Sequence, residues 1–195
     1  MDSLSKKQAK QFSKGSKTLA DGKSPWKVGV LIDSTTQKRS SLHSENVKKF
    51  NHGKGYVIGH QWTNVVLVIE DWIIPLTPIP FHSKTYCKKQ GIEYQTENQR
   101  VKEYIEKLDL AKYIGSHDPK KVLVLADSGY DDKKIEKAIL NKKWTFIIAL
   151  TKKRGVKSEK ESLRTRKSEG WASVADFFKK YRRAKWQTVR VTTNH

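Results

Sequence analysis

The chain has 195 residues and a formal net charge of +20, from 40 Lys and Arg against 20 Asp and Glu. This length suffices for one domain with its own hydrophobic core, and the charge predicts a polyanionic partner, with nucleic acid ahead of a membrane surface. No apolar run is long enough to span a bilayer, the N-terminus lacks the apolar core of a signal peptide, and the single Cys87 excludes an internal disulfide framework.

The first predicted elements are strands. Residues 1–25 are rich in Lys, Ser and Gln, and we interpret them as a basic linker or a frayed helix. A continuous, largely β-branched apolar run over residues 26–32 predicts a buried strand that ends at Asp33. Antiparallel strands are then predicted at residues 56–62, 65–69 and 72–76, after which prolines interrupt the ladder.

Helices and strands alternate in the next part of the chain. Thr96 and Gln99 form a capping-box pattern at the start of a predicted helix over residues 96–108, whose apolar residues recur at helical spacing. A buried strand is predicted at 122–126, ending at Asp127. The order is completed by a helix that Asp131 and Asp132 open as ordinary first-turn acids, and by a buried strand at 145–150. This order predicts an α/β fold with a mixed sheet.

Asp33 and Asp127 are the candidate catalytic residues. Each directly follows an apolar strand and begins a turn of small residues. If the two strands are parallel neighbours, both carboxylates project into one crevice beyond the strand ends. Paired carboxylates suit Mg²⁺, and metal ions can stabilise the attacking and leaving oxygens of phosphodiester chemistry. The alternative is that each Asp only caps a turn by accepting backbone N–H bonds.

The segments around these two acids resemble the motifs of insertion-sequence DDE transposases. Residues 28–35 (VGVLIDST) are similar to the first-strand motif of that family, and residues 125–130 (LADSGY) are similar to its second motif. The resemblance covers about residues 26–190 and implies an RNase H-like mixed sheet flanked by helices. It also implies that Asp33 and Asp127 bind Mg²⁺ or Mn²⁺ and catalyse DNA strand cleavage and transfer during transposition.

The family's third acid, a Glu in a Tyr-x2-Arg-x3-Glu-x6-Lys pattern, has no match downstream of Asp127. After Tyr181, the Arg and Glu positions hold Ala184 and Thr188. The segment Trp186–Arg190 is similar to a strand that family members usually continue beyond. We therefore expect a fragment that ends before the third acid, with an RNase H-like core at residues 26–150. Residues 151–195 are expected to be the start of an insertion or an incomplete later part of the core.

Half of the net charge lies in this last segment. Residues 151–195 carry 14 basic and four acidic side chains, against 19 and 14 in residues 28–150. A solvated tail would explain this charge, but we expect the segment to hold double-stranded DNA. The expected DNA-binding residues are Lys152, Lys153, Arg154, Lys157, Arg164, Arg166, Lys167, Arg182 and Arg183. The resemblance further implies a homodimer of the full-length protein and a cytoplasmic, nucleoid-associated location in a prokaryote, with no membrane contact.

Three other interpretations stay open. The chain could be a catalytically inactive remnant that only binds DNA, or an RNase H-like nuclease unconnected with transposition. The histidines His43, His52, His60 and His82, with Cys87, could suggest a structural zinc, but their spacing follows no zinc pattern.

Overall fold

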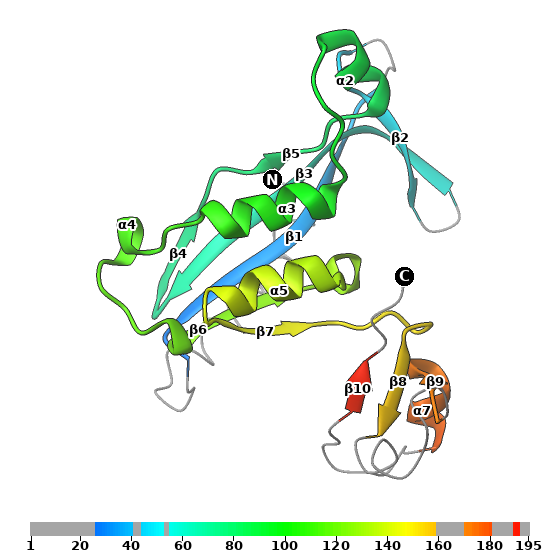
Figure 1. The fold of residues 1–195 in the computed structure, drawn as a ribbon. Coiled ribbons are helices and arrows are strands. Elements are labelled where there is room, and N and C mark those ends of the chain that lie inside the picture. The colour runs from blue at the N-terminus through cyan, green and yellow to red at the C-terminus, as the bar shows by residue number, and fades with distance from the viewer. Residues whose placement is uncertain (1–25, 41–43, 53–54, 159–169, 181–188, 192–195) are drawn as a thin grey trace.

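A mixed sheet with helices on one face forms the larger part of the computed structural model (Figure 1). The structure describes residues 26–40, 44–52, 55–158, 170–180 and 189–191. The sheet has the order β2-β3-β1-β6-β7, with β4 and β5 also paired to β3. Its strands are β1 (Val28–Lys38), β2 (Lys48–His52), β3 (Gly55–Ile69), β4 (Trp72–Pro75), β5 (Ile79–Pro80), β6 (Val122–Ala126) and β7 (Thr145–Ile148).

The strand directions are those of an RNase H-like core, as the sequence predicted. β3 pairs antiparallel with β1, β2, β4 and β5, whereas β1, β6 and β7 are parallel. A parallel pair needs a long crossover connection, and two helices fill these connections. They are α3 (Glu97–Lys107), between β5 and β6, and α5 (Lys133–Asn141), between β6 and β7.

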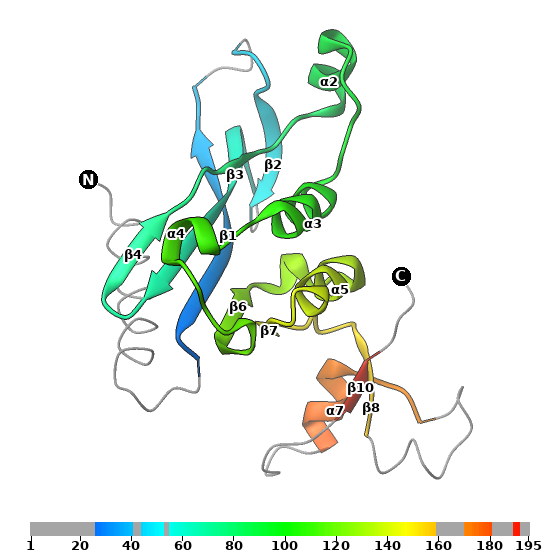
Figure 2. The same cartoon turned by 60° about the vertical axis from the view of Figure 1, so that its left-hand side comes forward.

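Helices α3 and α5 lie side by side on the same face of the sheet (Figures 1 and 2). The capping box at the start of α3 is confirmed: the Thr96 side chain accepts from Gln99 N–H, and the Gln99 side chain accepts from Thr96 N–H. Val101 and Ile105 of α3 and Ile139 of α5 are at most 1% exposed and pack on the apolar side chains of β1, β3 and β6. Removal of this apolar surface from water is the main stabilising term of the core.

Two strands are longer than the sequence predicted. β1 continues past Asp33 to Lys38, because its polar second half pairs with residues 59–64 of β3. β3 is one strand of 15 residues rather than two shorter ones. The tight turn between β3 and β4 is present, and Glu70 adopts a left-handed conformation there (φ 50°). Pro80 pairs with Trp62 at the edge of the sheet, where a proline is tolerated.

The remaining elements are short. They comprise α2 (Lys84–Gln90), α4 (Ala111–Ile114) and two 3₁₀ turns, η1 (Pro119–Lys121) and η2 (Ser128–Tyr130). A second sheet of order β10-β8-β9 follows the core and contains β8 (Gly155–Ser158), β9 (Ala172–Ser173) and β10 (Val189–Val191). Helix α7 (Val174–Lys180) packs on it through Val174 and Phe177. Residues 151–195 therefore include a small folded unit. Among the described residues, no helix has the length and apolar character needed to cross a membrane.

Candidate active site

Asp33 and Asp127 occupy neighbouring positions on two parallel strands. The last matched pair between β1 and β6 is Ile32 with Ala126, and the two aspartates are the next residues of their strands. Asp127 keeps an extended backbone (φ −80°, ψ −178°). Side chains two residues apart in a strand lie on the same face of the sheet. The carboxylate of Asp33 is therefore on the same face as Leu31, and that of Asp127 on the same face as Leu125. They lie on the face opposite to Val30 and Ile32, which pack against the helices.

The two carboxylates interact electrostatically. The pKa of Asp33 is raised, first because the side chain is partly buried and then because the charge of Asp127 is close. The backbone N–H of Ser34 opposes this shift, and the charge of Glu97 adds to it. A negative charge that disfavours the ionisation of a neighbouring acid, as Asp127 does for Asp33, is the electrostatic setting that a bound cation relieves.

Asp127 also makes the local hydrogen bond that the capping interpretation predicts. Its Oδ1 accepts from the backbone N–H of Gly129 at 2.9 Å, at the start of η2. A Cβ atom on Gly129 would lie 3.0 Å from this oxygen, which is tighter than an ordinary contact. The capping bond therefore fixes one carboxylate oxygen of Asp127. Gly129 has no side chain that would crowd this oxygen.

A polar network on the helix side of the sheet supports the same turn. The buried hydroxyl of Tyr130 donates to Oε1 of Glu97 at 2.8 Å, and Thr63 Oγ1 donates to the same atom at 2.7 Å. Gln61 Nε2 donates to Oε2 of Glu97 at 3.0 Å. Thr63 pairs with Ser34 across the β1–β3 ladder. The network thus joins β3, the first turn of α3 and the turn after Asp127, and burial raises the pKa of Tyr130.

Sequence reasoning missed Glu97 and Thr63. The capping box places Glu97 in the first turn of α3, but no sequence signal indicates that this turn faces Tyr130 rather than solvent. Asn64 was also missed. It pairs with Asp33 across the ladder, and both residues line a hollow of about 170 Å³. The side-chain oxygen of an Asn is an acceptable ligand for a hard cation.

The described residues hold no group of three or more His, Cys, Asp or Glu side chains arranged to bind a metal ion. His60 accepts from Arg39 Nε at 3.2 Å and lies 2.8 Å from the Glu45 carbonyl oxygen. His82 contacts Arg100 at 2.7 Å, and Cys87 is buried. His43 and the His52 side chain lie outside the described part.

The expected DNA-binding residues have different environments. Lys152 and Lys153 are exposed, whereas Arg154 is 5% and Lys157 2% exposed. Arg164, Arg166, Lys167, Arg182 and Arg183 lie outside the described residues. A duplex could not reach the buried side chains of Arg154 and Lys157 in this structure. The number of basic residues in the segment is therefore larger than the number of exposed charges that it offers to DNA.

Arg154 is held by acids of the core. Its guanidinium forms ion pairs with Asp131 at 3.2 Å and with Glu136 of α5 at 3.7 Å. The sequence predicted that Asp131 is an ordinary first-turn acid, and this prediction is wrong. Asp131 is the buried ion-pair partner of Arg154, the residue that precedes β8. Asp132 does act as a helix cap, because its Oδ1 accepts from Lys134 N–H at 2.7 Å.

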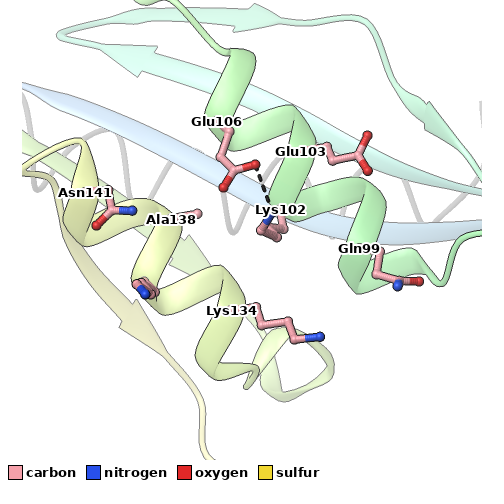
Figure 3. Close-up of a pocket in the computed structure, with 8 residues that line it drawn as sticks. Gln99, Lys102, Glu103, Glu106, Lys134, Ala138 and Asn141 are labelled. Atoms are coloured by element: carbon pink, nitrogen blue, oxygen red, sulfur yellow. Dashed lines mark hydrogen bonds and ion pairs between the residues drawn. The ribbon is translucent and has the colours of Figure 1, made fainter.

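A groove between two helices is separate from the two aspartates. A groove of about 520 Å³ lies between α3 and α5, and Figure 3 shows the Lys102–Glu106 ion pair of 3.0 Å on its α3 side. Lys134 and Asn141 line it from α5. Because neither Asp33 nor Asp127 reaches this groove, it is not part of the candidate active site.

The second half of the chain matches a known protein family. A family model described as "Transposase DDE domain" matches residues 87–193, which is more than half of the chain. The matched range contains Asp127, α5, β7 and the second sheet, and it begins after β1, so Asp33 lies outside it. Searches of curated proteins and of solved structures found no match.

Proposed function

Because the chain belongs to the transposases with a DDE domain, we propose that Asp33 and Asp127 are the first two acids of its catalytic site. The family is one of DNA-cleaving enzymes, and the chain contains a transposase catalytic core. The observation that carries the residue assignment is the parallel register of β1 and β6, which brings the two aspartates to adjacent positions. The homodimer and the nucleoid-associated location implied by the resemblance belong to the same proposal.

The donor set fits a divalent cation such as Mg²⁺ or Mn²⁺. The two carboxylates, with a raised pKa at Asp33, and the amide oxygen of Asn64, which pairs with Asp33 across the ladder, are hard oxygen ligands. When bound, the ion supplies stabilisation of the charge that develops on the attacking and leaving oxygens of a phosphodiester. The chain's own contribution is to hold the two carboxylates in place, through the β1–β6 register and the Gly129 N–H bond to Asp127.

The third acid is proposed to come from outside the described residues. A cation such as Mg²⁺ takes six oxygen ligands, some of them from water and substrate, and Asp33 and Asp127 leave room for a further protein ligand. Glu97 is not this acid in our proposal, because its oxygens are already engaged by Thr63, Tyr130 and Gln61. We assign Glu97 the role of positioning the turn that carries Tyr130.

The substrate is proposed to be duplex DNA, held through its phosphates. The basic second unit, with the exposed Lys152 and Lys153 at its start, supports this proposal. Such contacts would position the duplex without reading its sequence.

Metal binding by the purified chain tests the residue assignment. We expect Mn²⁺ titration, followed by electron paramagnetic resonance, to show a site that Asp33→Asn and Asp127→Asn each weaken by at least about tenfold, because each removes a charged ligand. The control is Asp71→Asn, which changes an exposed acid in the β3–β4 turn. Equal Mn²⁺ affinity in all four proteins would overturn the assignment.

A further inference from the structure

The end of the core sheet that is remote from the second sheet carries a projecting arm. We define the basic arm as the described residues 37–40, 44–52, 55–60 and 81–91. It comprises the last part of β1, β2, the first part of β3, and α2. In Figures 1 and 2 these elements extend beyond α3 at the end of the molecule opposite to β8 and β10.

The net positive charge of the core is concentrated in this arm. The arm contains seven Lys and Arg residues and a single acid, Glu45. The rest of residues 28–150 contains 12 basic and 13 acidic residues, so the core without the arm carries no net positive charge. The basic side chains of the arm that the structure describes are all exposed: Lys38, Arg39, Lys48, Lys49, Lys84, Lys88 and Lys89.

These charges are not neutralised within the described part of the chain. The ion pairs found there involve Lys102, Lys107, Arg154 and Lys179, and none of them includes a residue of the arm. Seven like charges on a small projection repel one another, which opposes folding unless a partner compensates for them. The arrangement therefore fits a polyanion.

The arm is a defined structure rather than a loose loop. Asn46, just before β2, binds the segment that leads into α2: its Nδ2 donates to the Phe81 carbonyl at 2.6 Å and its Oδ1 accepts from Ser83 N–H at 3.0 Å. Phe50 and Phe81 pack edge to face, with ring centroids 5.5 Å apart. Gln90 Nε2 of α2 donates to Glu45 Oε1 at 2.9 Å. The lysines are thus presented from a framework with a fixed shape.

Strand β1 joins the arm to the proposed catalytic pair. Asp33 and Lys38 both belong to β1, five residues apart. A strand rises about 3.3 Å per residue, so the base of the arm lies about 17 Å from Asp33. Successive phosphates of one DNA strand are spaced about 3.4 Å apart along the helix axis. This separation therefore corresponds to about five base pairs.

We propose that the basic arm binds the phosphate backbone of the DNA duplex, about five base pairs from the phosphodiester at Asp33 and Asp127. This inference rests on the proposed function of that pair. It adds a second contact region, separate from the basic C-terminal unit, on the other side of the site. The arm holds the duplex by charge and carries no sequence preference of its own.

A salt titration of DNA binding tests the arm. The arm variant replaces three exposed lysines of α2 (Lys84→Gln, Lys88→Gln and Lys89→Gln). The matched control removes the same charge from α5 (Lys133→Gln, Lys134→Gln and Lys137→Gln), where all three lysines are also exposed. Fluorescence anisotropy with two unrelated duplexes gives the slope of log affinity against log salt, which falls by about 0.9 for each phosphate that the protein no longer neutralises.

We expect the arm variant to bind both duplexes at least about tenfold more weakly at 0.1 M salt, with a slope reduced by about 1 to 2.7. The α5 control keeps the wild-type slope. A slope unchanged in the arm variant, an equal reduction in both variants, or no duplex binding by the wild type would each overturn the inference.

The test separates this inference from the proposed function. If the arm variant binds DNA like the wild type while Mn²⁺ still binds at Asp33 and Asp127, the arm inference fails and the residue assignment stands. If the arm variant loses DNA affinity but the Asp33→Asn and Asp127→Asn variants keep the Mn²⁺ affinity of the wild type, the residue assignment fails and the DNA contact of the arm stands.

Discussion

Tyr130 and Glu97, which are 33 residues apart in sequence, are joined by a hydrogen bond of 2.8 Å between the phenol hydroxyl and Oε1. This bond ties the turn that follows Asp127 to the first turn of α3. Tyr130 is 2% exposed, so water cannot replace the partner that either group would lose.

Tyr130→Phe should therefore destabilise the protein. A buried hydrogen bond to a charged group contributes about 1.5–3 kcal/mol, and about 1 kcal/mol shifts the Tm of a chain of this size by about 2–4 °C. We expect a Tm lower by about 3–12 °C in thermal unfolding followed by circular dichroism. Tyr113→Phe is the control, because Tyr113 is 49% exposed. An equal and small change in both variants would show that the Glu97 network is not stabilising.

The raised pKa of Asp33 predicts that this residue destabilises the metal-free fold at neutral pH. The unfolded chain ionises this carboxyl at its ordinary pKa, whereas the folded chain resists ionisation because of burial and of Asp127. Its favourable contribution is present below the ordinary pKa of an Asp and is lost as the pH rises through the higher folded pKa. Asp33→Asn should therefore raise the Tm at pH 7 in the presence of a chelator, by a few degrees, and change it little at pH 3.

Added Mg²⁺ should reduce this difference in Tm between Asp33→Asn and the wild type. A ligand that binds the folded state stabilises it in proportion to the logarithm of its concentration above Kd, and Asp33→Asn weakens the site. We expect 10–20 mM Mg²⁺ to raise the Tm of the wild type more than that of the variant. A wild type less stable with Mg²⁺ than without would count against a cation between the two acids.

Gly129→Ala should weaken metal binding more than it weakens the fold. The added Cβ would lie 3.0 Å from Asp127 Oδ1, so the carboxylate has to shift. We expect a several-fold loss of Mn²⁺ affinity with a Tm change within about 2 °C. Gly55→Ala is the control, since nothing lies within 4 Å of its added Cβ. Unchanged affinity in Gly129→Ala would mean that Asp127 is not a metal ligand or tolerates the shift.

Arg154→Met should be strongly destabilising. It leaves Asp131, which is 8% exposed, without the guanidinium 3.2 Å away. Breaking a buried ion pair from one side costs about 3–5 kcal/mol. Urea unfolding should show this loss, whereas Lys153→Met, at an exposed neighbouring position, should change stability by less than about 0.5 kcal/mol. Combination with Asp131→Leu should recover part of the loss, because the buried carboxylate that faced the lost guanidinium is then removed as well.

Much of the core follows from local sequence signals. The apolar run before Asp127, the capping box at Thr96 and the alternation of strands and helices each indicate an element that the structure contains. The adjacency of Asp33 and Asp127 was predicted on the condition that their strands are parallel neighbours, and β1 and β6 are. These signals are strong because each depends on burial or on capping within a few residues.

The basic arm could not be predicted in the same way. Residues 37–55 are polar, and β2 forms because β3 offers it a ladder, not because of an apolar pattern of its own. Asn46, which binds the segment that leads into α2, gives no signal in the sequence. The burial of Arg154 was missed for a related reason: its partner Asp131 is 23 residues away, in a turn that only the fold brings to it.

The clamp on Arg154 also decides how the second sheet can move. Six residues, 149–154, connect β7 to β8, and an extended linker of that length could span about 20 Å. The ion pairs of Arg154 with Asp131 and Glu136 anchor the last residue of the linker to the core, so the linker cannot extend over this distance. The Val174 N–H bond to the Arg154 carbonyl, at 2.8 Å, then fixes the start of α7 to the same point. These contacts therefore hold the second sheet against the core, so that it does not move freely at the end of a flexible linker.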